Sequence, residues 1–111
     1  MVAVLEKVRQ LENYLEWRGG QGDRVLDMTI SKVLQRERNQ MQTQLDRLRQ
    51  HLSVFEQQYG WPTPQFYERF GRGELGDDTD FFEWSATWEM VQQLQKGLVL
   101  LALRKLRSSI A

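Results

Sequence analysis

The residues that could do chemistry in this sequence are one histidine and a cluster of acidic side chains. His51 is flanked by Gln50 and Leu52, and the chain offers no cysteine or second histidine for a metal site. No serine or aspartate stands at the spacing of a catalytic triad either. We therefore interpret His51 as an imidazole at the surface or beside a helix seam, and we expect no enzyme activity.

The acidic residues follow one another closely at positions 74, 77, 78, 80 and 83. Such a cluster could attract a divalent cation, but the order of residues does not match an EF-hand loop. Asp80 and Glu83 have the D-x-x-E form of a capping box, so we favour helix capping and interaction with the helix dipole. The glycines at 71, 73 and 76 lead into carboxylates, which would repel phosphate. We therefore expect no metal ion and no cofactor.

Aromatic side chains are concentrated around this acidic cluster. Ten of the twelve in the chain lie between positions 55 and 88. Two interpretations stay open, because large rings can build a small core and can also anchor a protein partner. The rings that we expect to be partly exposed each adjoin a stronger core candidate: Trp61, Tyr67, Phe82 and Trp88.

Glycine and proline divide the chain into four helical stretches, at about 2–17, 24–58, 64–70 and 80–107. The first carries Val4, Leu5, Val8, Leu11 and Leu15 at the spacing of an amphipathic helix. Thr63 is expected to cap the third, with Pro64 at its first position. Because no stretch alternates apolar and polar residues over the length of a strand, we predict an all-α fold.

Two of these stretches have apolar seams near a 3.5-residue period. The seam of the second stretch is Leu34, Met41, Leu45, Leu48, Leu52, Phe55 and Tyr59. The seam of the last stretch is Trp84, Trp88 or Thr87, Val91, Leu94, Leu98 and Leu101. We predict a long antiparallel coiled-coil-like helical hairpin with the short aromatic helix at its bend, supported by the N-terminal amphipathic helix, as a single helical domain over 1–111. Pairing of the first seam between chains stays open, since periodicity does not identify the partner.

The charge and composition of the chain argue against several classes of function. The chain has 15 basic and 15 acidic residues and no cysteine. The zero net charge lacks the basic excess of most nucleic-acid-binding proteins, so contact with nucleic acid is not expected. The absence of disulfides favours the reducing cytoplasm, and the longest apolar run, 98–103, is far below the roughly 20 residues of a membrane span. We interpret the basic side chains as solvated helix faces: Arg36, Arg38, Arg47, Arg49, Arg104, Lys105 and Arg107.

Residues 55–86 carry a recognisable pattern: FExxYG, then FYxxF, then GELGDD and DFFEW. This pattern resembles a family of small, mostly uncharacterised helical proteins of cyanobacteria, other bacteria and archaea. Members are often encoded beside a second small gene in toxin–antitoxin pairs, so the resemblance implies an antitoxin-like role. The chain departs from this family at one place. Members commonly open the short helix with a Ser or Thr accompanied by acidic residues, whereas this chain has Pro62-Thr63-Pro64-Gln65 and lacks the acidic residues.

These observations favour an antitoxin-like protein–protein interaction module that binds a small basic partner through segment 59–88. An acidic rim would steer a basic partner, and aromatic rings would anchor it. The residues expected to make the contact are Trp61, Tyr67, Asp77, Asp78, Phe82, Glu83 and Trp88. The alternative is a homo-oligomeric helical scaffold that pairs through the seam from Leu34 to Tyr59.

Overall fold

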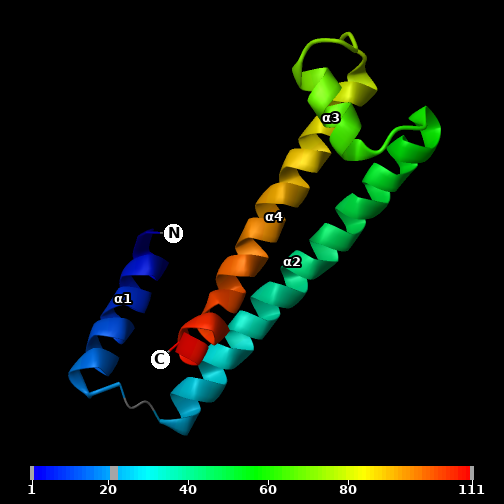
Figure 1. Ribbon diagram of the computed structural model, residues 1–111. Coiled ribbons are helices and arrows are strands. Elements are labelled where there is room, and N and C mark those ends of the chain that lie inside the picture. Colours follow the sequence, from blue (N-terminus) through cyan, green and yellow to red (C-terminus); the bar gives the residue numbers. More distant parts are fainter. Residues whose placement is uncertain (1, 21–22, 111) are drawn as a thin grey trace. The chain divides into compact units, whose positions relative to one another are not determined.

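The computed structural model describes the backbone of residues 2–20 and 23–110 and the side chains of 3–20 and 23–102. These residues form four helices: α1 (Val2–Trp17), α2 (Arg24–Tyr59), α3 (Thr63–Gly71) and α4 (Thr79–Ile110) (Figure 1). No strand occurs among them, so the predicted all-α class is confirmed for the described part of the chain. No helix in that part is long and apolar enough to cross a membrane.

The chain divides into two compact units, residues 1–35 and residues 36–111. Helix α2 crosses from the first unit into the second. In the first unit, the carboxylate of Asp23 accepts a hydrogen bond of 2.7 Å from the backbone N–H of Leu26. Asp23 therefore caps the start of α2, because its side chain satisfies an N–H group that the first helical turn leaves unpaired.

Few of the apolar residues in the amphipathic pattern of α1 are even partly buried. Its residues Leu11 and Leu15 are half-buried, whereas Val4, Leu5 and Val8 are exposed. The ring of Tyr14 lies 6.2 Å from that of Trp17, and both rings are exposed. Only part of the apolar stripe of α1 is therefore buried in the structure.

The core lies in the second unit and is built from three helices. Its buried apolar side chains come from α2 (Leu45, Leu52, Phe55), α3 (Phe66) and α4 (Phe81, Trp84, Val91). These residues include much of both predicted seams. In the open choice between positions 87 and 88, Thr87 is 4% exposed and takes the seam position, while Trp88 is half-buried.

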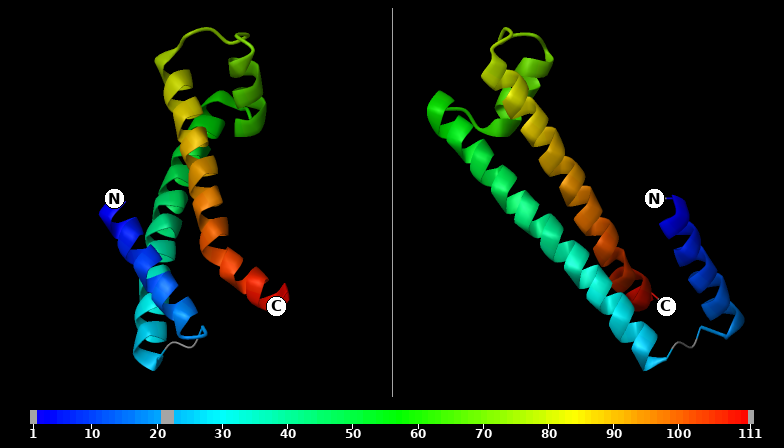
Figure 2. Two further views of the ribbon diagram at one scale, coloured as in Figure 1. Left: turned by 90° about the vertical axis from the view of Figure 1, so that its left-hand side faces the viewer. Right: turned by 180° about the vertical axis from the view of Figure 1, so that it is seen from behind.

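The part of α2 that belongs to the second unit lies beside α4 (Figures 1 and 2). Near one end a methyl group added at Gly97 would overlap the terminal methyl of Met41, which marks a close approach of the two helices. Farther along, His51 contacts Glu83. Residue numbers rise along α2 as they fall along α4, so the two helices contact each other in opposite chain directions.

Helix α3 packs its aromatic face on α4. The ring of Phe66 stacks on the indole of Trp84, with centroids 3.8 Å apart and planes 3° from parallel. Phe81 of α4 also lies 5.5 Å from Phe66 and 6.2 Å from Phe70. Because a helix of nine residues is marginal alone, this burial is what holds α3 in place.

The caps of α3 and α4 differ from the prediction. Pro62 is the N-cap of α3 and makes no side-chain cap, so Thr63 is already inside the helix and Pro64 follows it. Helix α4 starts at Thr79, where the carboxylate of Asp78 accepts the Asp80 N–H at 2.9 Å. Both predicted caps are therefore wrong, because the side chains of Thr63 and Asp80 are engaged by distant residues.

Candidate interaction surface

Segment 59–88, which we call the acidic segment, carries most of the charge asymmetry of the chain. It holds six acidic and two basic residues, a net charge of −4, so the rest of the neutral chain carries +4. Its two arginines are already engaged by carboxylates: Arg69 lies 3.6 Å from Glu74, and Arg72 lies 3.2 Å from Glu68. The exposed face of this segment therefore presents mainly negative charge.

The carboxylate of Asp80 accepts a hydrogen bond from within the chain. The hydroxyl of Tyr59 donates a hydrogen bond of 2.6 Å to its carboxylate. This bond, with partial burial and the negative charges of Asp80 and Asp78, raises the pKa of Tyr59 to about 12. The bond ties the end of α2 to the start of α4, just before Gly60 turns the chain with a φ of 75°.

Two of the predicted contact residues are half-buried rings with partners of their own. Trp61 lies 6.3 Å from Phe81, and the guanidinium of Arg69 lies 5.9 Å from the Trp61 ring. Tyr67 donates a hydrogen bond of 2.9 Å to Glu89, and this bond, partial burial and the carboxylate charge raise the pKa of Tyr67. The predicted partial exposure of both rings is confirmed, and each also helps to fix α3.

Asp77, Asp78 and Phe82 are predicted contact residues that are exposed in the structure. The side chain of Phe82 is 56% exposed and rests edge-on against Phe70, with centroids 5.2 Å apart. Asp77 and Asp78 are exposed in the turn before α4. The backbone carbonyl of Asp78 accepts the N–H of Phe82 at 3.4 Å, so Asp78 and Phe82 are joined across the first turn of α4. We call Asp77, Asp78 and Phe82 the acidic corner.

The remaining two predicted residues point elsewhere. Glu83 contacts His51 at 3.1 Å across to α2, and both side chains are about half exposed. Trp88 is half-buried and packs against the core. On an α-helix, Glu83 and Trp88 project about 100° and 240° from Phe82. Phe82, Glu83 and Trp88 therefore do not share one face of α4, and the predicted set separates into the acidic corner and its surroundings.

The sequence reasoning missed a buried polar network beneath the surface. The indole N–H of Trp84 donates to the hydroxyl of Thr63 at 3.0 Å, and that hydroxyl donates to a carboxylate oxygen of Glu56 at 2.8 Å. The same oxygen accepts the backbone N–H of Thr63 at 2.8 Å. Glu56 thus occupies the N-terminus of α3 from outside, where the helix dipole favours negative charge. The FExxYG and PTP motifs contain two of these residues, but nothing local relates them to Trp84.

Among the residues that the structure describes, no three His, Asp or Glu side chains gather in a way that could hold a metal ion. The side chains of Arg104, Lys105 and Arg107, predicted to be a solvated basic face, lie outside the described residues. The chain matches no protein-family model, no curated protein and no solved structure.

Proposed function

We propose that this chain is an antitoxin-like protein–protein interaction module of the cytoplasm, which binds and neutralises a small basic protein through the acidic segment. The observation that carries the proposal is the acidic corner. There Phe82 stays 56% exposed about one helical turn after two exposed aspartates, within a segment of net charge −4. An exposed aromatic residue rimmed by charge of one sign is typical of a protein interface.

The two residue types would act at different stages of binding. Asp77 and Asp78 would attract a basic surface over a distance and raise the association rate. Phe82 would then lose its remaining contact with water against an apolar site on the partner. Trp61, Tyr67, Glu83 and Trp88 would contribute only through their exposed parts, since each is also engaged within the chain.

The rest of the second unit supports this proposal as a rigid frame. We propose that α2 and α4 form a coiled-coil-like helical hairpin, with α3 packed at its bend. The side-chain bonds from Tyr59 to Asp80 and from Trp84 to Thr63 hold the acidic corner against this frame. Presenting a contact surface on a rigid frame lowers the entropy lost on binding.

The test begins with purification of the tagged chain from its own host cells. Mass spectrometry should identify one small basic protein at near-equal stoichiometry, and that protein should be toxic when expressed alone. The double variant Asp77→Lys/Asp78→Lys should then bind the purified partner with a lower association rate. Elution of the bait alone, or a partner whose association rate is the same for the variant, overturns the proposal.

Pairing between chains through the seam from Leu34 to Tyr59 is not proposed. Leu45, Leu52 and Phe55 are buried within the second unit, so they leave no apolar face for another chain. A scaffold that assembles through this seam would have to separate α2 from α4.

A further inference from the structure

Helix α4 carries a second stripe of regularly spaced residues on the side opposite its core seam. The residues of this stripe, which we call the outer stripe, recur at intervals of three and four and are all exposed: Ala86, Glu89, Gln93, Lys96 and Leu100. On an α-helix they lie within an arc of about 80°, and the buried Val91 projects from the opposite side. These five residues therefore share one face of α4 over a length of about 21 Å.

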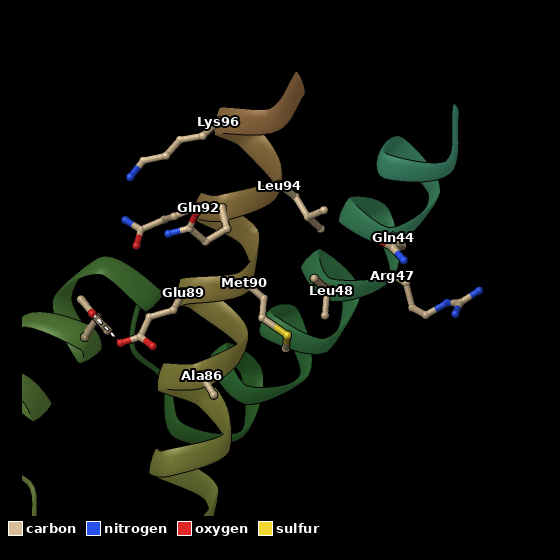
Figure 3. Close-up of a pocket in the computed structure, with 11 residues that line it drawn as sticks. Gln44, Arg47, Leu48, Ala86, Glu89, Met90, Gln92, Leu94 and Lys96 are labelled. Carbon is tan, nitrogen blue, oxygen red and sulfur yellow. Dashed lines mark hydrogen bonds between the residues drawn. The ribbon is translucent and has the colours of Figure 1, made fainter. Parts of the chain in front are cut away.

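The outer stripe borders a groove with a volume of about 970 Å³. The floor of this groove is apolar, with Leu48 from α2 and Met90 and Leu94 from α4, and Met90 is 48% exposed. Figure 3 shows Met90 and Leu94 directed toward α2, while Glu89 and Lys96 project on the other side of α4. The outer stripe and this apolar floor therefore lie on different sides of α4, and the stripe is a surface of its own.

The outer stripe carries one acidic and one basic side chain, Glu89 and Lys96. Glu89 and Lys96 stand seven residues apart, so they lie two helical turns apart on one side of α4. Among the described residues, Lys96 has no ion-pair partner. Glu89 accepts the Tyr67 hydroxyl through one carboxylate oxygen, which leaves the other oxygen free to accept a bond.

We propose that the outer stripe is the interface of a symmetric dimer, in which α4 packs antiparallel on α4 of a second copy. A twofold axis near position 93 places Glu89 of each copy beside Lys96 of the other, which gives two reciprocal ion pairs. The same axis places Ala86 of each copy against Leu100 of the other, because the midpoint of 86 and 100 lies within half a residue of the midpoint of 89 and 96. Leu100 is 67% exposed in the single chain and becomes covered in the dimer.

The self-complementary order of the stripe is what selects a second copy as the occupant. In a twofold interface each surface must match its own reverse, and this stripe reads small, acidic, amide, basic, large along α4. Reversal sets acidic against basic and small against large, and the amide of Gln93 faces its own copy. A partner of another sequence would need this pattern by coincidence, whereas a second copy has it necessarily.

The test is a charge exchange measured by sedimentation equilibrium over a range of concentrations. The wild-type chain should dimerise, and Glu89→Lys and Lys96→Glu should each weaken the dimer by about tenfold or more, since each sets like charges together. A mixture of these two variants should recover the dimer, because both pairs between positions 89 and 96 then join opposite charges again. The double variant Glu89→Lys/Lys96→Glu should also dimerise alone.

Two controls separate the proposed pairing from other effects. Arg49→Glu makes the same charge change as Lys96→Glu on an exposed position outside the groove and should leave the dimer intact. Tyr67→Phe removes the internal bond to Glu89 and should also leave it intact. A wild-type chain that stays monomeric at all concentrations overturns the proposal. A dimer that both single variants retain, or a mixture that recovers nothing, overturns it as well.

This inference does not depend on the proposed function. The variant Asp77→Lys alters the acidic corner but neither the outer stripe nor the bond of Asp78 at the start of α4, so it should slow partner association and leave the dimer mass unchanged. Glu89→Lys should have the opposite pattern. The two proposals can therefore fail separately.

Discussion

The buried network around Thr63 allows a quantitative test of the frame that holds the acidic corner. Thr63 is 1% exposed, and its hydroxyl joins the indole of Trp84 to the carboxylate of Glu56. The substitution Thr63→Val keeps the shape of the side chain but removes the hydroxyl. Trp84 is itself fully buried, so its indole N–H would lose its acceptor with no route to water.

The loss in unfolding free energy expected for Thr63→Val follows from the groups that the substitution leaves unpaired. A buried donor without a partner costs about 1–3 kcal/mol. The lost bond to Glu56 adds a smaller amount, about 1 kcal/mol, because this half-buried carboxylate keeps the backbone N–H of Thr63 and reaches water. Thr63→Val should therefore lower the free energy of unfolding by about 2–4 kcal/mol in total. Thr63→Ser keeps the hydroxyl and loses one methyl group, so it should cost only about 1 kcal/mol.

The measurement is urea unfolding followed by far-ultraviolet circular dichroism for both variants and the wild type. The unfolding free energy of Thr63→Val should lie below that of Thr63→Ser by at least about 1 kcal/mol. In a Trp84→Phe background, where the donor is absent, Thr63→Val should cost less than in the wild type. Equal losses for Val and Ser, or the same cost in both backgrounds, would show that the network does not stabilise the fold.

Two further predictions concern the contacts between α2 and α4. The pKa of Tyr59 is about 12 in the folded chain and about 10 when unfolded, so its contribution to stability is complete below pH 10 and is lost as the pH rises toward 12. Urea midpoints between pH 9 and pH 12 should therefore fall, and they should fall less steeply for Tyr59→Phe; parallel slopes would contradict the assignment. Gly97→Ala should change the unfolding free energy by less than about 1 kcal/mol, because the gain in helix propensity offsets displacement of the Met41 methyl group. Gly97→Leu should cost about 1–3 kcal/mol in thermal or urea unfolding, and a neutral result would refute the close approach.

Local patterns in the sequence predict the helices and much of the core of this chain. Leu45, Leu52 and Phe55 are buried, as the seam of α2 predicts, because a helix that packs along its length must repeat its apolar residues with its own period. The choice between Thr87 and Trp88 could not be made in this way. The two positions differ by about 100° around α4, and only the direction of the neighbouring helix decides which one faces inward.

The caps and the buried network could not be predicted for a related reason. Thr63 and Asp80 have the residue types and local spacing of helix caps, and local spacing alone favours that role. Their side chains are instead taken by Glu56 and Trp84 in one case and by Tyr59 in the other. These bonds join residues up to 21 positions apart, so they exist only once α3 and α4 have packed.

The contact surface could not be predicted fully for the same reason, because the sequence does not show which way each side chain projects in the folded chain. Composition drew attention to segment 59–88, but it could not show that Phe82, Glu83 and Trp88 project from α4 on different sides. Exposure also separates the rings, since Phe82 is open while Trp61 and Trp88 pack against the core. The hypothesis of a contact surface therefore rests mainly on the acidic corner, which consists of Asp77, Asp78 and Phe82.

The most direct test of the proposed function is the association rate of the co-purified basic partner at low and high salt. We expect Asp77→Lys/Asp78→Lys to lower that rate by about tenfold at low salt and by less at high salt, since ions screen the attraction. The matched variant Glu12→Lys/Glu16→Lys makes the same change in net charge on exposed positions of α1 and should have little effect. Equal losses for the two variants, or no loss for either, would contradict a contact through the acidic corner.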